Sequence, residues 1–389
     1  MFPFPVLFLS TQGGVVPLPE GIVKKVVSIS YLASGYQNSV AVLLSDGRLF
    51  TQGENVYGEL ADGTLLANNN NFHLAASDID DVFNGDRCFI VKRKDGSWRY
   101  SGSGEGLNGA GSSVTSFTAL PSQITNAFSL ADISNITGAN GNTLWLLKNG
   151  SLFGSGTNAN SCLGTGNSNS VVTPRAIASG VKKMASIFSN ATYLTNSGSM
   201  MTCGTLYRIG GASAPSGSSV FRAVDFTGTG DTVFVKDFSI STQQVFVIGS
   251  PSISDPVSYF YASGITSADY RKVQEYAAGF SDGFIPAGNS GYHIVISGEF
   301  LALGLNSTGA LGTGDKNSTT VPLVPVYPFK DKEGWDASLV QQITQANLTS
   351  DQGASFLVYN HNLFMSGASK IAQSSFNGTQ FKNIPEFNT

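Results

Sequence analysis

The side chains that could carry out chemistry are few in this 389-residue chain, and none of them forms a known catalytic or metal-binding pattern. The chain has three histidines, and no His-x-x-x-His, Cys-x-x-Cys or Glu-x-x-His spacing that would bring two ligands to one metal ion. His73 lies in an asparagine-rich segment, His293 opens an apolar run and His361 stands at a turn. Histidines in such positions are usually solvated or structural. We therefore expect no catalytic residue, no metal site and no cofactor.

The three cysteines are odd in number and fall in different parts of the chain. Cys88 and Cys203 lie in segments with the composition of strands, and Cys162 lies in a loop. Free cysteine behaves as a small buried hydrophobe in most folds. We therefore expect three buried, unreactive thiols.

A glycine recurs along the chain, each time at the end of a short apolar segment such as Leu49-Phe-Thr-Gln-Gly53. A period of about 40–50 residues is typical of propellers, solenoids and arrays. A glycine costs about 0.5–1 kcal/mol relative to alanine inside a regular element. Its return at one register therefore predicts a bulge or a close approach of two backbones. We call these residues the anchor glycines: Gly53, Gly102, Gly156, Gly204, Gly264, Gly304 and Gly367.

Each anchor glycine closes a predicted β-hairpin. An apolar run such as Ser39–Leu44 is too short for a helix and is bounded by turn residues, which indicates a strand. A turn such as Asp46-Gly47 or Asn149-Gly150 follows, and glycine there supplies the positive φ that a tight two-residue hairpin requires. A second short strand then leads to the anchor glycine.

A finer pattern follows three of the anchors. Gly53-Glu-Asn-Val-Tyr-Gly-Glu-Leu-Ala-Asp-Gly63 matches residues 304–314 in its Gly, Asn and Leu positions, and residues 156–166 differ in having serine for the middle glycine. Gly-x-Asn-x-x-Gly-x-Leu-Gly-x-Gly after an Asp-Gly hairpin resembles the repeat of the RCC1-type seven-bladed β-propeller. The resemblance covers about residues 26–384 and implies one four-stranded blade per repeat around a central channel. The usual Gly-x-x-His of that family is mostly missing, as in Gly35-Tyr-Gln-Asn38.

The predicted organisation is therefore all-β: an N-terminal apolar arm over residues 1–21 and a single seven-bladed β-propeller over residues 22–389. The arm superficially resembles a signal peptide, yet no Lys or Arg precedes Lys24 and prolines interrupt it. We expect it either to close the ring by pairing with the last blade or to dock on a neighbouring protein. Cleavage of this segment on secretion is the alternative.

Composition limits the classes of partner. Charged residues make up 12% of the chain, about half of the usual share, and the net charge is −4. The longest Lys/Arg run is three residues, Lys92-Arg93-Lys94, which argues against a nucleic-acid partner. No apolar stretch approaches the roughly 20 residues of a membrane-spanning helix. A hydrophobic content of 41% suffices for a folded core.

One rim loop concentrates charge in this charge-poor chain. It lies in the longest interval between anchor glycines and carries Lys332, Glu333 and Trp335. We take it as a candidate partner-contact loop, because aromatic residues anchor many interfaces. The alternative is a solvated insertion whose tryptophan packs on a blade.

These features favour a non-enzymatic structural or protein-binding propeller. We expect its partners to be other proteins of a larger assembly, bound through the arm and the rim loops, with homo-oligomers also open. The uncharged polar surface and the apolar arm resemble exterior proteins of tailed bacteriophage particles, which would place the protein on a virion as a decoration, neck, tail or host-attachment component. A secreted bacterial protein-binding or inhibitor propeller is the alternative. Guanine-nucleotide exchange, the founding activity of the RCC1 family, and an enzyme with a site at the channel mouth rank below both.

Overall fold

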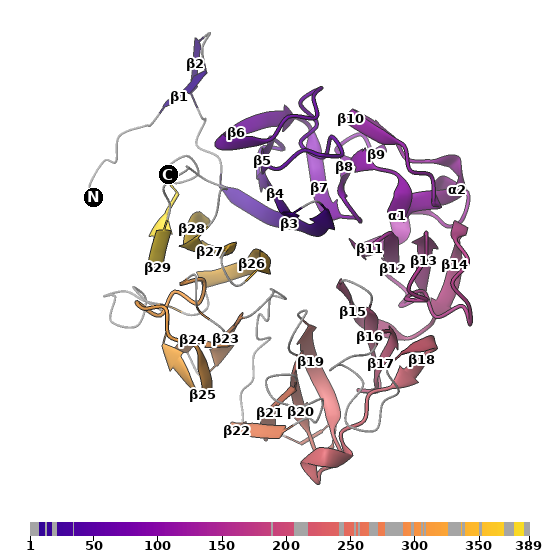
Figure 1. Cartoon of the computed structure of the whole chain (residues 1–389), viewed down its shortest axis with the longest axis vertical. Helices are drawn as coiled ribbons and strands as arrows, with labels where there is room; N and C mark the ends of the chain where they lie inside the picture. Colours follow the sequence, from indigo (N-terminus) through magenta and orange to yellow (C-terminus); the bar gives the residue numbers. More distant parts are fainter. Residues whose placement is uncertain are drawn as a thin grey trace.

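In the computed structural model, seven antiparallel sheets are arranged in a ring (Figure 1). The structure describes residues 8–11, 14–17, 22–33, 35–187, 190–205, 217–240, 245–252, 254–255, 257–263, 271–276, 291–296, 299–304, 306, 309–325, 336, 339–349, 352–368 and 377–384.

Six of these sheets are four-stranded meanders, each built from consecutive strands. Blades 1 to 5 follow one another along the chain, and the last blade is formed by the C-terminal part. Their strands are β3 Val23–Ala33, β4 Gly35–Leu44, β5 Leu49–Gly53 and β6 Asn68–Ala76 in blade 1; β7 Ile79–Asn84, β8 Cys88–Arg93, β9 Trp98–Ser103 and β10 Ser113–Ala119 in blade 2; β11 Ile133–Ala139, β12 Asn142–Leu147, β13 Leu152–Gly156 and β14 Val171–Ala178 in blade 3; β15 Val181–Ile187, β16 Asn190–Thr195, β17 Met200–Gly204 and β18 Ser218–Ala223 in blade 4; β19 Phe234–Ile240, β20 Val245–Ser250, β21 Ser258–Ser263 and β22 Arg271–Tyr276 in blade 5; and β26 Val340–Thr349, β27 Gln352–Tyr359, β28 Asn362–Ala368 and β29 Asn377–Asn383 in the last blade.

The seventh sheet, between blade 5 and the last blade, has three strands among the described residues: β23 Gly291–Ile296, β24 Glu299–Gly304 and β25 Thr319–Pro325. They correspond to the second to fourth strands of the other blades, because Gly291 pairs with the anchor Gly304 as Asn142 pairs with Gly156. The prediction of a seven-bladed propeller of four-stranded blades is therefore wrong in its count. Among the described residues, six blades are four-stranded and one sheet has three strands.

The Asp-Gly and Asn-Gly pairs lie in hairpin turns, as predicted, but most of these turns have three residues and not two. Gly47 N–H donates to the Leu44 carbonyl and Leu44 N–H donates to the Arg48 carbonyl, which makes a three-residue turn that ends in a left-handed glycine (φ +97°). The Asp46 carboxylate accepts the Arg48 N–H at 2.9 Å. The same turn recurs at residues 94–96, 148–150 and 196–198. Among the described turns between second and third strands, only that of the last blade has two residues with two positive φ values, at Asn360 and His361.

The innermost strands share a second signal that sequence reasoning missed. Each begins apolar-polar-polar-apolar, as in Val23-Lys-Lys-Val26 and Ile79-Asp-Asp-Val82. A β-bulge at this point adds one residue to the strand, so both flanking apolar residues face the core and the two polar residues turn away from it. The bulge recurs in β11, β15, β19 and β26.

The hydrophobic core is divided into layers between neighbouring blades. One layer joins blades 1 and 2 through residues such as Val27, Leu43 and Val91, and another joins blades 2 and 3 around the fully buried Trp145. A third layer, with Val23, Val40 and Phe356, joins the last blade to blade 1. The ring is therefore closed by packing of two complete blades.

The described part of the N-terminal arm pairs with none of the blades. Its described part is a hairpin of β1 Phe8–Thr11 and β2 Gly14–Pro17, and each of these strands pairs only with the other among the described residues. Figure 1 shows this hairpin outside the ring. The expectation that the arm pairs with the last blade is wrong, since β26–β29 form a sheet of their own.

The remaining regular elements of the described chain are short: the helices α1 Glu105–Asn108 and α2 Ser122–Thr125, and two 3₁₀ turns, Leu130–Asp132 and Thr227–Thr229. Within the ranges given above, none of the helices has the length and apolar character that a membrane span requires.

Candidate functional site

A buried asparagine organises the loops that follow the third strand. In blade 1, Asn55 is fully buried and its Oδ1 accepts the Leu60 N–H at 2.9 Å. Its Nδ2 donates to Asp62 Oδ1 and to the Thr64 carbonyl, both at 3.0 Å. Asn158 binds the Leu163 N–H in the same way, and Asn306 binds that of Leu311. The Gly-x-Asn-x-x-Gly-x-Leu pattern thus encodes one loop backbone used at least three times.

The anchor glycines lie where two backbones approach closely. Gly102 has φ +114°, and a Cβ there would overlap the Arg87 carbonyl oxygen and lie 2.8 Å from the Cys88 Cα. A Cβ on Gly53 or Gly156 would likewise overlap the backbone at the second strand of its own blade. Gly204, Gly304 and Gly367 also have positive φ values. Gly264 lies outside the described residues. These glycines fix the crossing into the loop and make no contact that would serve catalysis.

In four blades the residue before the anchor glycine links the blade to the previous one. Ser101 Oγ of blade 2 donates to the Gly58 carbonyl of blade 1 at 2.6 Å. Ser155 Oγ of blade 3 donates to the Gly106 carbonyl at 3.3 Å, and Cys203 Sγ donates to the Cys162 carbonyl at 2.7 Å. Ser366 in the last blade reaches the Ala310 carbonyl at 2.9 Å. A buried polar side chain is thereby satisfied across the boundary between blades.

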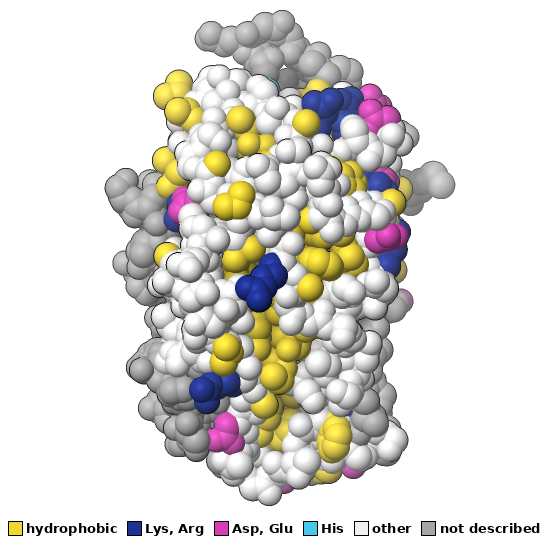
Figure 2. All heavy atoms as spheres, turned by 90° about the vertical axis from the view of Figure 1, so that its right-hand side faces the viewer, with side chains coloured by type: hydrophobic (Ala, Val, Ile, Leu, Met, Phe, Trp, Pro, Cys, Tyr) yellow, Lys and Arg dark blue, Asp and Glu magenta, His cyan; other side chains and the backbone are white. Residues whose placement is uncertain are grey.

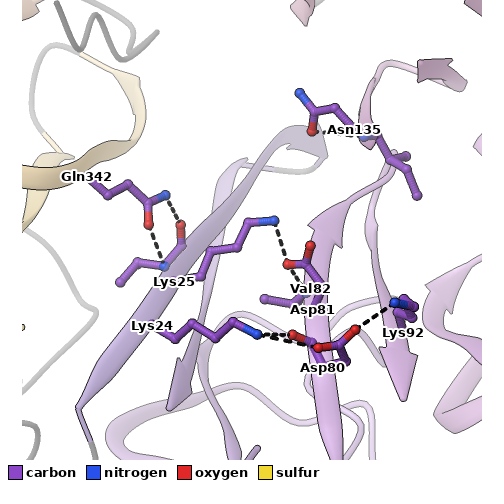
Figure 3. A network of polar contacts seen from close by, with 10 residues as sticks. Lys24, Lys25, Asp80, Asp81, Val82, Lys92, Asn135 and Gln342 are labelled. Carbon is purple, nitrogen blue, oxygen red and sulfur yellow. Dashed lines mark hydrogen bonds and ion pairs between the residues drawn. The ribbon is translucent and has the colours of Figure 1, made fainter. Parts of the chain in front are cut away.

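The bulged inner strands carry a polar network that joins neighbouring blades (Figure 3). Lys25 Nζ of β3 lies 2.7 Å from Asp81 Oδ1 of β7, and Lys25 Nζ lies 3.9 Å from the centre of the Phe83 ring. Asp81 Oδ1 also accepts its neighbour's backbone N–H, from Val82. Burial lowers the pKa of Lys25, and the Asp81 carboxylate counteracts part of that effect. The pair therefore joins blades 1 and 2.

The same position of the inner strands carries a second ion pair. In the last blade it carries a glutamine whose hydrogen bonds close the ring. Lys183 Nζ lies 2.5 Å from Asp237 Oδ1 between blades 4 and 5. In the last blade, Gln342 accepts the Val26 N–H at 2.8 Å and donates to the Val26 carbonyl at 2.5 Å. The Val23 N–H also donates to the His361 carbonyl, so the last blade and blade 1 are joined at two points.

One carboxyl group is buried at the opposite end of the ring. Asp86, in the turn between β7 and β8, is 1% exposed and lies beside Arg87 and Glu105. Burial raises the pKa of Asp86 to about 6, although Arg87 and the backbone N–H groups of Gly141 and Asn140 oppose the rise. Arg87 Nη1 binds Glu105 Oε2 at 2.6 Å. A Cβ on Gly106 would lie 2.6 Å from the Asp86 Cβ, so closely packed chain surrounds this carboxyl group.

The histidines and cysteines are placed as structural groups. His293 is fully buried and its Nε2 lies 3.0 Å from the Leu311 carbonyl. Burial lowers the pKa of His293 to about 4, so its ring is neutral and Nε2–H donates to that carbonyl. The expectation of buried cysteines is confirmed, since all three are free and buried. Burial raises the pKa of the Cys162 thiol to about 12 and that of Cys88 well above its ordinary value.

Two remaining candidates lie in different situations. His361 is exposed, and its ring accepts a hydrogen bond from Gln341 Nε2. The partner-contact loop with Lys332, Glu333 and Trp335 lies outside the described residues. Within the described part of the chain, no group of three or more His, Cys, Asp or Glu side chains could hold a metal ion.

No protein-family model matches the sequence. Among solved structures, the chain is similar to human WBSCR16, with a TM-score of 0.64 at 14% identity over 87% of this chain and 94% of that one. It is also similar to yeast RCC1 (Prp20) bound to Kap60, with a TM-score of 0.63 at 12% identity over 87% of this chain and 84% of that one.

The fold is that of RCC1-like β-propellers. A second structure of Prp20p from Saccharomyces cerevisiae, described together with the binding of that protein to Gsp1p and histones, gives a TM-score of 0.63 at 12% identity over 88% of this chain and 87% of that one. At such low sequence identity, the structural similarity establishes only that the fold is shared.

The two ends of this propeller differ in charge. One end carries the hairpin turns between second and third strands, such as residues 45–47 and 94–96; we call it the turn face. The other carries the loops between third and fourth strands, such as residues 54–67; we call it the loop face. In blades 1 to 3 the described lysines all lie toward the turn face. The charged residues of the loop face there are Glu54, Glu59, Asp62, Asp86, Arg87 and Glu105.

Proposed function

We propose that this chain is a non-enzymatic, protein-binding propeller that recognises its partner through the loop face. The observation that carries the proposal is the common loop frame held by Asn55, Asn158 and Asn306. The hydrogen bonds of the asparagine fix the backbone from within, so the outward residues are free to differ between blades. A rigid scaffold with variable loops is a common basis of recognition.

The outer side of the ring supports a binding role in a different way. Figure 2 shows mostly uncharged side chains there, with hydrophobic atoms in bands and few charged groups. Such a surface has little long-range electrostatic attraction for nucleic acid. Protein partners, which are bound by RCC1-like neighbours such as Prp20, fit it better.

A site-specific crosslinking experiment tests the proposal. A photoreactive amino acid is placed at Leu66 on the loop face or at Asp95 on the turn face, both exposed, and the protein is irradiated in cells of its source. We expect adducts of one discrete mass from position 66 and none from position 95. Adducts from position 95 alone, or from neither position, would refute binding through the loop face.

The larger assembly belongs to the same proposal. A place on the outside of a tailed-phage particle follows from composition and from the apolar arm, and the similar folds, which come from human and yeast proteins, add no support to it. Immunogold microscopy of particles separates it from the alternative of a secreted binding module. Deletion of residues 1–20 should leave a folded ring that no longer joins its assembly, and normal incorporation would exclude docking by the arm.

Guanine-nucleotide exchange is not favoured over protein binding in general. The similarity to yeast RCC1 is at 12% identity and concerns the fold. A nucleotide-release assay with a small GTPase tests this activity directly, and we expect no acceleration.

A further inference from the structure

The loop between β5 and β6 exposes three aliphatic side chains. Val56 is 44% exposed, Leu65 is 54% exposed and Leu66 is 74% exposed. The hydrogen bond from Asn55 Nδ2 to the Thr64 carbonyl holds the two ends of the loop together at 3.0 Å. Val56 and Leu65 follow these two residues in the chain, so the bond brings their backbone positions near each other. We call Val56, Leu65 and Leu66 the aliphatic patch.

The fold does not require aliphatic residues at these positions. Counting from the buried asparagine, the equivalents of the patch in blade 3 are Ala159, Ser168 and Asn169. In the loop of the three-stranded sheet, Lys316 and Asn317 stand in place of the two leucines. In all three loops the asparagine Oδ1 accepts the leucine N–H five residues on, and its Nδ2 donates to the backbone carbonyl nine residues on. Exposure of apolar side chains is therefore a property of the blade 1 loop alone among these three.

The surroundings of the aliphatic patch are acidic. Glu54 and Asp62 belong to the same loop and are partly exposed, and Glu105 lies on the neighbouring blade. Arg87 is the one cation of the described loop face in blades 1 to 3, and it lies 2.6 Å from Glu105 and 3.6 Å from Asp86. The blade 3 loop, residues 157–170, contains no charged residue. An exposed apolar patch with a predominantly acidic rim is typical of an interaction site.

We propose that the aliphatic patch binds a protein segment that presents apolar side chains flanked by lysine or arginine. The proposal rests on the proposed protein-binding function and adds the chemistry of the partner. The apolar residues of that segment would cover Val56, Leu65 and Leu66, and its cations would face Glu54 and Asp62. The chain's own arm does not fit this description, since it has no Lys or Arg before Lys24.

The test uses three short synthetic peptides. All three have leucines at the same positions, and the remaining positions are lysine in one peptide, glutamine in the second and glutamate in the third. Binding to the full-length protein is measured by fluorescence anisotropy. We expect the lysine peptide to bind at least about tenfold more tightly than the glutamate peptide, with the glutamine peptide between them. No binding of the lysine peptide up to about 1 mM, or equal binding of all three peptides, would overturn the proposal.

Matched variants come from the protein's own repeats. The triple variant Val56→Ala, Leu65→Ser, Leu66→Asn gives blade 1 the residues of blade 3 on an unchanged loop frame, and we expect its affinity for the lysine peptide to fall at least about tenfold. The reverse triple variant Ala159→Val, Ser168→Leu, Asn169→Leu places the apolar residues in an uncharged loop, and it should gain little preference for lysine. Glu54→Gln should reduce the lysine preference while the aliphatic patch remains.

Other occupants give different results. If a second copy of this chain covers the patch, the wild type self-associates in analytical ultracentrifugation and the blade 1 triple variant does not, which would overturn the proposal. Crosslinked adducts at position 66 without a preference for the lysine peptide would leave the protein-binding function in place and refute the chemistry of the partner proposed here.

Discussion

Lys25 of the innermost strand of blade 1 lies 2.7 Å from Asp81 of blade 2, and each residue stands immediately after a β-bulge. Lys183 and Asp237 repeat the arrangement between blades 4 and 5. The bulge makes it possible, since it turns a polar side chain away from the core at a point where strand alternation would bury it. The contact between blades is thus set by an extra residue in each strand.

The first prediction concerns the strength of this contact. Lys25→Gln and Asp81→Asn should each lower the free energy of unfolding, and the double variant should show a coupling of about 0.5–1 kcal/mol in a double-mutant cycle, because the pair is partly exposed to solvent. Denaturant titration measures it. The coupling should shrink in high salt. Strict additivity of the two single variants would mean that the ion pair contributes nothing to joining the blades.

The anchor glycines should be far more sensitive to substitution than the turn glycines. Gly102→Ala would press a methyl group against the backbone at Arg87 and Cys88, and we expect a loss of more than about 2 kcal/mol. Gly96→Ala is the matched control: its φ is also positive at +85° but nothing lies within 4 Å of the added atom, so the cost should be about 1 kcal/mol. Similar losses in thermal denaturation would remove close approach as the cause.

The loop frame should depend on the amide nitrogen of the buried asparagine. Asn55→Asp keeps the acceptor for the Leu60 N–H and replaces the donor to Asp62 and Thr64 with a second carboxylate oxygen. We expect a loss of about 2–3 kcal/mol and faster hydrogen exchange at residues 56–66. Exchange in the blade 3 loop, which has its own asparagine, should not change. Unaltered exchange at residues 56–66 would contradict a frame held by Asn55.

Two buried groups should give the stability of the ring opposite dependences on pH. Folding raises the pKa of Asp86 to about 6, so the native state binds more protons than the unfolded state between about pH 4 and 6, and stability from this group falls as the pH rises. Folding lowers the pKa of His293 to about 4, so between about pH 4 and 6.5 stability from this group rises with pH. Each effect is about 3 kcal/mol at most.

The wild type should therefore vary little in stability across this range, and variants should reveal the two slopes. Asp86→Asn should become more stable as the pH rises from 4 to 6.5, whereas His293→Gln should become less stable. Chemical denaturation at several pH values measures both, and the double variant should again be nearly flat. If Asp86→Asn had the same dependence of stability on pH as the wild type, the pKa of this carboxyl group would not be raised by folding.

The sequence was sufficient for the parts of the fold that repeat locally. Asp-Gly turns, the Gly-x-Asn-x-x-Gly-x-Leu loop and short apolar runs act within one hairpin, and each predicted hairpin among the described residues is present. The turn geometry was less accessible: Asp46-Gly47 reads as a two-residue turn, and the Asp46 side chain that caps the following N–H favours three residues.

Features that depend on the neighbouring blade could not be predicted. Asp80 and Asp81 lie in β7 and bind lysines of β3, a contact that the sequence of one blade alone does not indicate. Their signal was present as an apolar-polar-polar-apolar tetrad repeated in register, but only the bulge explains why two polar residues adjoin in a strand. The anchor Gly304 marks the hairpin of β23 and β24 and predicts no further strand by itself, and residues 277–290, which precede β23, lie outside the described residues.

Closure of the ring by whole blades has a consequence for connectivity. Every four-stranded blade is one uninterrupted stretch of chain, and the boundary between the last blade and blade 1 is bridged by the same kinds of contact as the other boundaries, through Val23, Val26 and Gln342. The point at which the polypeptide starts is therefore topologically arbitrary. A circular permutant opened between Ala178 and Val181, with residues 22 and 384 joined by a flexible linker, should adopt the same ring.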